Sequence, residues 1–346
     1  LQAFSAFGTH WAILGGAGSS SLSVLQLGED GSLSLKDHLI DNLQTRFAGL
    51  TALEVVQVEG HVFVVTAGRD DGLSLFRLVP DGQLVHVQSL PHDTGLELQN
   101  VSALEATVLD GQIQIFASSQ GTAGLSWFSI ELDSLGSVIE ARDGSANLTG
   151  TRGDDLLVGH DGPITLRGAA GDDVLLAGRG GGVLTGGAGA DIFVPCPTRD
   201  RVQISDFEVG QDQIDMSCFA GLRSLGQLQV QTLADGLRLQ WGDTKITVYS
   251  ADGTPLALQD LWPSGFTAPD RIPLGETLTS GVEFGSSGAD HLNGSGHKDQ
   301  IDGLGGNDTL NGGGRADKLW GGDGRDVLSG GKGADRLWGQ AGNDVV

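Results

Sequence analysis

The sequence is poor in aromatic residues, in cations and in long apolar runs. Phe, Trp and Tyr make up 5% of its 346 residues, which indicates turns and thin layers rather than a large globular core. Its 20 Lys and Arg face 44 Asp and Glu, so the formal net charge is -24 and a nucleic-acid partner is not expected. No apolar run reaches the length of a membrane-spanning helix, so no such helix is predicted.

Cysteines and catalytic motifs are scarce as well. Cys196 and Cys218 are the only cysteines; they lack metal-ligand spacing, and either a disulfide in an oxidising compartment or two buried thiols would suit them. The motifs H-E-x-x-H, G-x-S-x-G and G-x-G-x-x-G and the phosphate-binding loop are absent, so we predict no catalytic residue. Because the chain begins with Leu1 and shows no signal peptide, we expect a processed or partial chain.

Glycine, in contrast, is abundant, with 57 residues, and residues 285–346 place it in the nine-residue pattern G-G-x-G-x-D-x-U-x, where U is a large apolar residue. A flexible linker has no reason to keep an apolar residue at every ninth position. The sixth position is always acidic, and these residues are Asp290, Asp299, Asp308, Asp317, Asp326, Asp335 and Asp344. The pattern therefore predicts a regular, repeated fold.

Each part of the repeat has a physical role. Glycines allow a tight turn through left-handed backbone conformations, which leaves carbonyl groups pointing inward. One carboxylate per turn adds a charged oxygen, and Ca²⁺ prefers such a cage of oxygen ligands. The x-U-x segment is expected to form a short strand with its apolar residue inside. Two nonapeptides make one coil, so calcium sites are expected between aspartates that are 18 residues apart.

This spacing divides the aspartates of residues 285–346 between two edges. Asp290, Asp308, Asp326 and Asp344 share the first edge and predict three sites, whereas Asp299, Asp317 and Asp335 share the second and predict two. Fourth-position glycines are expected to contribute as well, and these are Gly288, Gly306, Gly324 and Gly342 on the first edge and Gly333 on the second. His297 and Arg315 replace this glycine on the second edge, so we expect weaker binding there.

The same register runs through an earlier block that begins at Gly150. Asp155, Asp173 and Asp191 are 18 residues apart, with Gly153, Gly171 and Gly189 at the fourth positions. The intervening sixth positions are Ile164 and Gly182, so we predict two calcium sites on one edge and an opposite edge that is empty or weak. Together the two blocks predict about seven sites.

These repeats resemble the RTX family of secreted proteins, whose nonapeptides wind into calcium-bound parallel β-rolls. The resemblance implies export in the unfolded state by a type I system. Residues 202–217 resemble the stretch D-x-I-x-D-F-x-x-G-x-D-x-I-D-x-S that follows the repeats in serralysin-type proteases. They indicate a β cap on the roll, in which Asp206 and Asp212 could complete a terminal calcium site.

The N-terminal part carries a longer repeat of about 51 residues. Residues 10–14 match residues 61–65, and a third copy starts at Gln112. Each copy is expected to form three or four short strands, as in the blades of a β-propeller. Three blades do not close a propeller, so upstream blades, blades from other chains or an open β domain are the alternatives.

The expected fold is all-β, with a partial propeller-like domain followed by two parallel β-rolls and a cap between them. We assign residues 1–142 to propeller-like repeats, 144–194 to the first roll, 195–266 to the cap, 267–284 to a linker and 285–346 to the second roll. Trp320 and Trp338 should stack on the outer face of the second roll, about 4.8 Å apart.

The functional expectation is a secreted or cell-surface protein whose rolls fold when they bind calcium. We expect a structural or adhesive component of a matrix, surface layer or filament. Extracellular polysaccharide, the cell surface or further copies of the chain are the expected partners beside Ca²⁺. The alternative is a fragment of a secreted propeller enzyme, of lactonase or hydrolase type, that carries the rolls for export and stability.

Overall fold

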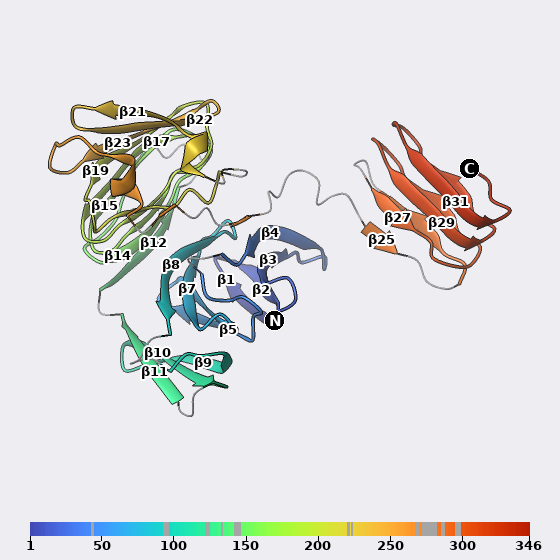
Figure 1. Cartoon of the computed structure of the whole chain (residues 1–346), viewed down its shortest axis with the longest axis horizontal. Coiled ribbons are helices and arrows are strands. Elements are labelled where there is room, and N and C mark those ends of the chain that lie inside the picture. The colour runs from blue at the N-terminus through green and yellow to red at the C-terminus, as the bar shows by residue number, and fades with distance from the viewer. Residues whose placement is uncertain are drawn as a thin grey trace. The chain divides into compact units, whose positions relative to one another are not determined.

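The computed structural model describes residues 1–42, 45–92, 97–121, 125–132, 134–141, 147–219, 222, 224–263, 265–266, 270–271, 282–284, 288–294 and 299–346. They belong to two compact units, Leu1–Pro273 and Leu274–Val346. Strands dominate both units (Figure 1), and the described helices are the single turns α1 (Leu258–Leu261) and η1 (Leu225–Gln227). No helix in the described ranges is long and apolar enough to cross a membrane. The predicted all-β class is confirmed.

The first unit begins with three antiparallel sheets, each built on a meander of consecutive strands. The first meander contains β1 (Gln2–Ala6), β2 (Thr9–Gly16), β3 (Ser21–Leu27) and β4 (Leu33–Ile40), and the distant strand β24 (Asp270–Arg271) pairs with β4. The second contains β5 (Ala52–Val58), β6 (His61–Ala67), β7 (Gly72–Leu78) and β8 (Leu84–Pro91). The third contains β9 (Val101–Leu109), β10 (Gln112–Ser119) and β11 (Leu125–Glu131). The segments matched by the long repeat thus lie on the second strand of each meander.

Two parallel sheets form the roll of the first unit. One contains β12 (Leu135–Glu140), β14 (Asp154–Val158), β16 (Val174–Leu176), β18 (Ile192–Val194) and β20 (Gln213–Ile214). The other contains β13 (Asn147–Thr149), β15 (Ile164–Ala170), β17 (Gly182–Ala188), β19 (Arg201–Phe207) and β23 (Thr244–Ser250). It is extended by two antiparallel strands, β22 (Gly236–Trp241) and β21 (Gln229–Leu233). The strands of the repeat block pair at the 18-residue offset of the repeat, as Leu156 does with Val174, whereas β20 pairs with β18 at an offset of 21 residues.

The strand β12 shows how the roll starts. It follows the third meander in sequence, yet it pairs in parallel with β14, with Leu135 opposite Asp154 and Ile139 opposite Leu157. The roll also packs against the second meander, since Val79 and Val85 share a buried cluster with Leu156. The meanders and the first roll are therefore joined by packing as well as by the chain.

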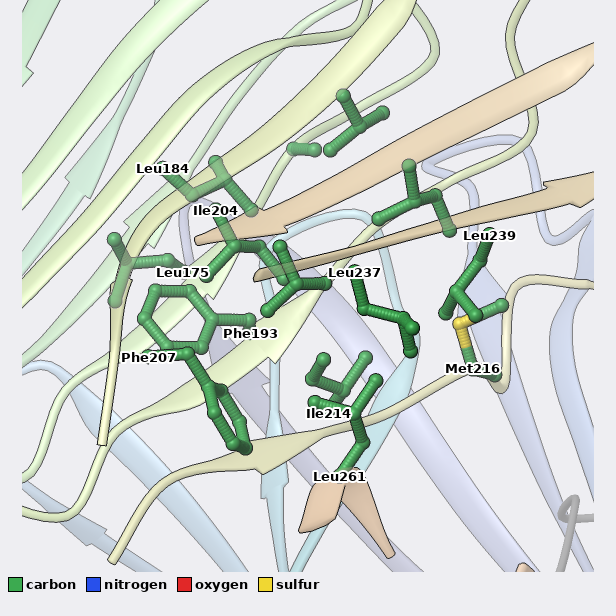
Figure 2. Packing of buried hydrophobic residues seen from close by; sticks show 14 of the residues in the cluster. Leu175, Leu184, Phe193, Ile204, Phe207, Ile214, Met216, Leu237, Leu239 and Leu261 are labelled. Carbon is green, nitrogen blue, oxygen red and sulfur yellow. The ribbon is translucent and has the colours of Figure 1, made fainter. Parts of the chain in front are cut away.

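The interior of the first roll is a continuous apolar core, part of which Figure 2 shows. Phe193 and Phe207 lie with their ring centroids 6.5 Å apart, and both side chains are buried. Leu237 and Leu239 of β22 join the same cluster. Each fully buried side chain of this size contributes about 1.5–3 kcal/mol relative to exposure. The strands after the roll therefore share its core.

A disulfide joins Cys196, just after β18, to Cys218, just after β20. Their Cα atoms are 5.1 Å apart, within the usual range for a disulfide. The sequence alone left this pairing open. The bond closes a short loop and so restricts the unfolded chain.

The second unit is a thinner roll of two parallel sheets. One contains β25 (Val282–Phe284), β27 (Gln300–Asp302), β29 (Lys318–Gly324) and β31 (Arg336–Gly342). The other contains β26 (His291–Asn293), β28 (Thr309–Asn311) and β30 (Val327–Ser329). Its core is a column of eighth-position side chains, formed by Leu292, Ile301, Leu310, Leu319 and Leu328 with Leu337 packed against them. The predicted parallel β-roll arrangement is confirmed in both units.

Candidate metal-binding ladders

The sixth-position aspartates of the first roll form one column across successive coils. The amide of Asp155 donates a hydrogen bond to Oδ1 of Asp173 at 2.7 Å, and the amide of Asp173 donates to Oδ1 of Asp191 at 3.0 Å. The column continues to Asp212, whose Oδ1 accepts from the amide of Asp191 at 3.0 Å. All four aspartates are buried. We call this column the first ladder.

The second roll carries two such columns. On its first edge, Asp290 donates to Asp308 at 2.8 Å, Asp308 to Asp326 at 2.9 Å, and Asp326 to Asp344 at 3.1 Å. On its second edge, Asp299 donates to Asp317 at 2.8 Å and Asp317 to Asp335 at 3.0 Å. Each bond runs from an amide to the Oδ1 atom 18 residues later. The structure thus brings together the aspartates of each predicted edge.

The second carboxylate oxygen is unpaired in five of these aspartates. The Oδ2 atoms of Asp173, Asp191, Asp308, Asp317 and Asp326 are buried and have no hydrogen-bond partner. A buried charged oxygen without a partner is costly, and native proteins seldom tolerate it. Such repeated orphan oxygens fit a site for a cation between the coils.

First-position glycines complete the surroundings of these oxygens. A Cβ atom added to Gly303 would lie 2.6 Å from Oδ2 of Asp308 and 2.4 Å from the carbonyl oxygen of Gly321. One added to Gly321 would lie 2.5 Å from Oδ2 of Asp326 and 2.7 Å from the carbonyl oxygen of Gly339. A side chain would therefore fill the space in which a carboxylate and a carbonyl of the next coil converge.

The donor chemistry of this space suits a hard cation. Among the described residues, no three His, Cys, Asp or Glu side chains converge into one metal-binding group. Beside the orphan oxygens of Asp173, Asp308, Asp317 and Asp326 lies instead a backbone carbonyl oxygen of the next coil. Carboxylates and carbonyls are the oxygen ligands of calcium sites. The carbonyl groups of the first-position glycines were not named as candidate ligands in the sequence analysis. The constant spacing of these glycines in the repeat was the signal that could have identified them.

The fourth-position glycines have a different and steric role. Positive φ angles occur at Gly171, Gly189, Gly306, Gly324, Gly333 and Gly342. A Cβ atom on Gly324 would lie 1.5 Å from the carbonyl oxygen of Gly306, and one on Gly306 would lie 2.4 Å from that of Gly288. At Gly153 the nearest atom would be the carbonyl oxygen of Ser134, at 2.3 Å. These positions therefore allow adjacent coils to stack closely.

The two edges for which weak binding was predicted differ in the residues that they present. In the first roll, Ile164 and Gly182 pair with each other at the sixth positions, and Ile164 is buried in the core. In the second roll, Arg315 adopts a left-handed φ of 69°, which is unfavourable for a residue with a Cβ atom. His297 lies outside the described residues. The orphan oxygen of Asp317 shows that the second edge nevertheless keeps a buried carboxylate site.

Burial changes the proton affinity of the first ladder. Loss of hydration raises the pKa of Asp173 to about 8 and that of Asp191 to about 7, and neighbouring carboxylates add to both shifts. The pKa of Asp212 is raised to about 6, again mainly by burial. The pKa of Asp317 in the second roll is also raised by burial. Protons and a bound cation would therefore compete for these groups.

Asp206 lies at the end of the first ladder. Its carboxylate accepts hydrogen bonds from the amides of Gly186 and Gly187 at 3.0 and 2.9 Å. Burial raises its pKa, and its charge raises the pKa of Asp191. The structure thus places both acids of the serralysin-like stretch, Asp206 and Asp212, beside the last repeat aspartate.

Protein groups close the other end of this ladder. The carboxylate of Asp155 accepts hydrogen bonds from the amides of Ser137 at 2.6 Å and Thr151 at 2.5 Å. The buried guanidinium of Arg77 contacts the carbonyl oxygens of Asp155 at 3.3 Å and Asp154 at 3.4 Å. No sequence motif distinguishes Arg77, which reaches these atoms from β7. The first coil is therefore anchored to the second meander.

His61 completes this anchor. Its Nδ1 accepts a hydrogen bond from Arg77, and its Nε2 donates to the carbonyl oxygen of Gly136 at 3.2 Å. Burial and the adjacent guanidinium lower its pKa to about 4, so the imidazole is neutral near pH 7. In the sequence, His61 only opens the segment 61–65 that matches residues 10–14 of the long repeat. Its buried position gives it a structural role at the junction.

A known family of calcium-binding repeats matches the two rolls. Residues 141–162, 149–184, 167–194, 284–310 and 311–346 match the model of the RTX calcium-binding nonapeptide repeat. No curated protein sequence matches the chain significantly. Among solved structures, the extracellular lipase LipA from Serratia marcescens is similar at 21% identity and a TM-score of 0.22, over 58% of this chain and 31% of the lipase. The matched repeats coincide with the two rolls, so these rolls are RTX calcium-binding nonapeptide repeats and the chain is an RTX-repeat protein.

Proposed function

We propose that this protein is secreted, that its rolls fold on calcium after export, and that it serves as a structural or adhesive component outside the cell. The observation that carries the calcium part is the set of five buried, unpaired carboxylate oxygens in the ladders. A divalent cation between the coils would neutralise pairs of these groups and replace the hydration that burial removes.

We take each hydrogen-bonded pair of ladder aspartates as one candidate site between two coils. On this criterion we infer three sites in the first roll, including one between Asp191 and Asp212. The second roll would hold three on its first edge and two on its second. The site that involves Asp212 is additional to the seven expected from the 18-residue spacing, because this residue follows Asp191 by 21 positions.

The ladders also explain why folding would wait for export. Where calcium is scarce, ionised aspartates in adjacent coils repel one another and cannot be buried at low cost. Where calcium is abundant, its binding free energy becomes folding free energy. Export of an unfolded chain by a type I system, as the RTX resemblance implies, is consistent with such coupling.

The remaining parts of the first unit suit a scaffold. We interpret the three meanders as blade-like repeats and residues 195–266 as the cap of the first roll. The hairpin of β21 and β22 extends the second sheet of this roll, and Leu237 and Leu239 cover its interior. The packing of Val79 and Val85 against the roll joins the two parts. A rigid, calcium-stabilised scaffold of this kind favours a structural or adhesive role over catalysis.

The test of this proposal is a calcium titration of the full chain after treatment with a chelator. We expect circular dichroism to show a gain of β structure with calcium and calorimetry to show several bound ions. Asp308→Asn removes a carboxylate shared by two sites and should raise the calcium midpoint, whereas Asp323→Asn, at an exposed acid of the same roll, should not. An unchanged β spectrum in chelator would refute coupled folding.

The adhesive or assembly role needs a separate measurement. Light scattering of the full chain, with and without calcium, reports self-assembly, and retention on intact cells or extracted matrix reports adhesion. Calcium-dependent assembly or retention would support the role. A calcium-bound protein that stays monomeric and binds neither surface would contradict it while leaving calcium binding intact.

A further inference from the structure

The two outer faces of the second roll differ in chemistry. On β29 and β31, the seventh and ninth repeat positions point away from the buried Leu319 and the partly buried Leu337. Lys318 pairs across the strands with Arg336, and Trp320 pairs with Trp338. We call these four residues the Trp–cation face. The corresponding strand positions of β26, β28 and β30 carry no Lys, Arg, Asp or Glu, and they are His291, Asn293, Thr309, Asn311, Val327 and Ser329.

The tryptophans of the Trp–cation face stack as predicted. Their ring centroids are 5.0 Å apart and the ring planes differ by 9°. The side chain of Trp338 is 41% exposed. Two adjacent aromatic rings held rigidly on a sheet form a preordered apolar surface, and exposed surfaces of this kind mark contact sites.

The cations of this face lie unusually close together. Lys318 and Arg336 are both exposed and occupy directly paired positions of neighbouring parallel strands. Like charges at paired positions are destabilising unless an anion lies between them. Within the described part of the chain, neither side chain has a hydrogen bond or an ion pair. This arrangement fits an external anion.

Calcium binding would change the net charge of the segment that carries the Trp–cation face. Residues 285–346 contain nine Asp and six Lys or Arg, so the metal-free segment is acidic. Seven of the nine aspartates belong to the two edges of the ladders. The other two are Asp323 and Asp302, and Asp302 lies on β27 directly opposite Trp320, at the border of the Trp–cation face. Each bound Ca²⁺ adds two positive charges inside the roll, and about five ions would make the whole segment cationic. This change in the sign of the charge is not apparent from the acidic composition of the full chain.

We propose that the Trp–cation face binds an acidic polysaccharide, and that it does so only when the second roll is loaded with calcium. This inference rests on the proposed calcium binding and deepens the proposed adhesive role. An extended polysaccharide advances by about one sugar ring per strand spacing of about 4.8 Å, so a chain crossing the strands can place one anionic group near each cation. The apolar C–H surfaces of its sugars can then contact the aromatic rings.

The experiment uses immobilised dextran sulfate, with uncharged dextran as the matched polymer. The full chain is applied in calcium, in an equal concentration of magnesium, and in chelator. We expect retention on dextran sulfate in calcium that weakens with added salt, and none on dextran. Magnesium controls for screening of the polymer, because it matches the charge of calcium but prefers a smaller, more rigid site.

Two double variants distinguish the effect of the Trp–cation face on binding from the effect of the total charge of the protein. Lys318→Gln with Arg336→Gln removes two positive charges from the Trp–cation face and should weaken binding about tenfold. Asn311→Asp with Ser329→Asp makes the same change in net charge on the other face, at exposed positions of β28 and β30, and should weaken binding about twofold or less. Trp338→Ala should reduce binding without changing its salt dependence.

The outcomes are distinct. Equal weakening by both double variants, or retention independent of calcium, would overturn the assignment of the face. Binding of duplex DNA as tight as that of dextran sulfate, with the same variant effects, would overturn the assignment of a polysaccharide. Calcium binding is measured on the same samples by calorimetry. Intact calcium binding without retention therefore rejects this inference alone, whereas failure to bind calcium rejects the proposed function.

Discussion

The close stacking of the second roll makes a sharp prediction for two glycines in neighbouring turns. Gly324 has a φ of 146°, and a Cβ atom there would lie 1.5 Å from the carbonyl oxygen of Gly306. Gly305 differs, because the nearest atom to its Cβ position is the carbonyl oxygen of Asp323 at 4.0 Å. We therefore expect Gly324→Ala to disrupt the stacking of coils and Gly305→Ala to leave it intact.

The magnitude follows from two terms. A left-handed conformation costs a residue with a Cβ atom about 1–2 kcal/mol. Relief of a backbone overlap adds about 1–3 kcal/mol, as in overpacked cores. A total of about 3 kcal/mol is large for a roll whose core is a single column of leucine and isoleucine side chains. The control substitution has neither term and should change stability by less than about 1 kcal/mol.

Because folding is expected to be coupled to calcium binding, the loss of stability is measured as a shift in the calcium midpoint of folding. If about five ions bind as the second roll folds, a loss of about 3 kcal/mol is shared among them and raises the calcium midpoint only about threefold. The assay is hydrogen exchange of the full chain, read by mass spectrometry in peptides from β28 to β31 across a calcium titration. Peptides of the first roll serve as an internal reference, because neither substitution lies in that unit.

Two outcomes would contradict a steric role for the fourth-position glycine. If Gly324→Ala and Gly305→Ala became protected at the same calcium concentration as the unmodified chain, close contact at the fourth position would not control stacking. If both shifted equally, loss of glycine flexibility in general would be responsible. Only a shift confined to Gly324→Ala supports the steric argument.

Three further predictions concern the first unit. Arg77→Met should lower the stability of this unit by about 2–4 kcal/mol, since it leaves buried carbonyls and an imidazole nitrogen unpaired, whereas the exposed Arg201→Met should have little effect in thermal unfolding. In chelator, stability should fall as pH rises from about 5 to 8, because the folded pKa values of Asp173 (about 8) and Asp191 (about 7) exceed the unfolded value near 3.8, so the folded state binds more protons in this range. The lowered pKa values of His61 and His86 act in the opposite sense below about pH 6.5, but the buried acids with raised pKa values, Asp212 among them, outnumber these two histidines. A rise in stability with pH would contradict the burial of these carboxylates. Asp212→Asn should remove one bound calcium ion in calorimetry, and an unchanged stoichiometry would exclude this residue from the ladder.

The repeat pattern predicted the rolls well because all their defining interactions recur at a constant spacing. The offset of 18 residues places each apolar residue in register, as for Leu319 opposite Leu337. It also predicted the stack of Trp320 on Trp338 and the aspartates that share an edge. In such a fold, local geometry and tertiary contacts follow the same period, so sequence position determines the neighbours.

Other features depend on contacts that have no period. Arg77 meets the backbone of Asp155 across 78 residues of sequence, and only the packing of β7 against the roll brings them together. Asp212 joins the first ladder although it follows Asp191 by 21 residues rather than 18, because β19 and its turn add residues to the coil. The strand β12 pairs with the roll although it follows the third meander directly in sequence. Such contacts arise from tertiary packing, which local patterns do not encode.

We expect the two rolls to depend on calcium to different degrees. The first roll shares its core with β22 and α1, is held by a disulfide, and has protein donors at both ends of its ladder, at Asp155 and at Asp206. The second has one apolar column and five inter-coil carboxylate pairs, so a larger part of its folding free energy must come from the metal. Falling calcium should thus unfold the second roll first and remove the Trp–cation face while the scaffold of the first unit persists. The nonapeptide repeat that stabilises one unit would then act in the other as a calcium-controlled switch for surface binding.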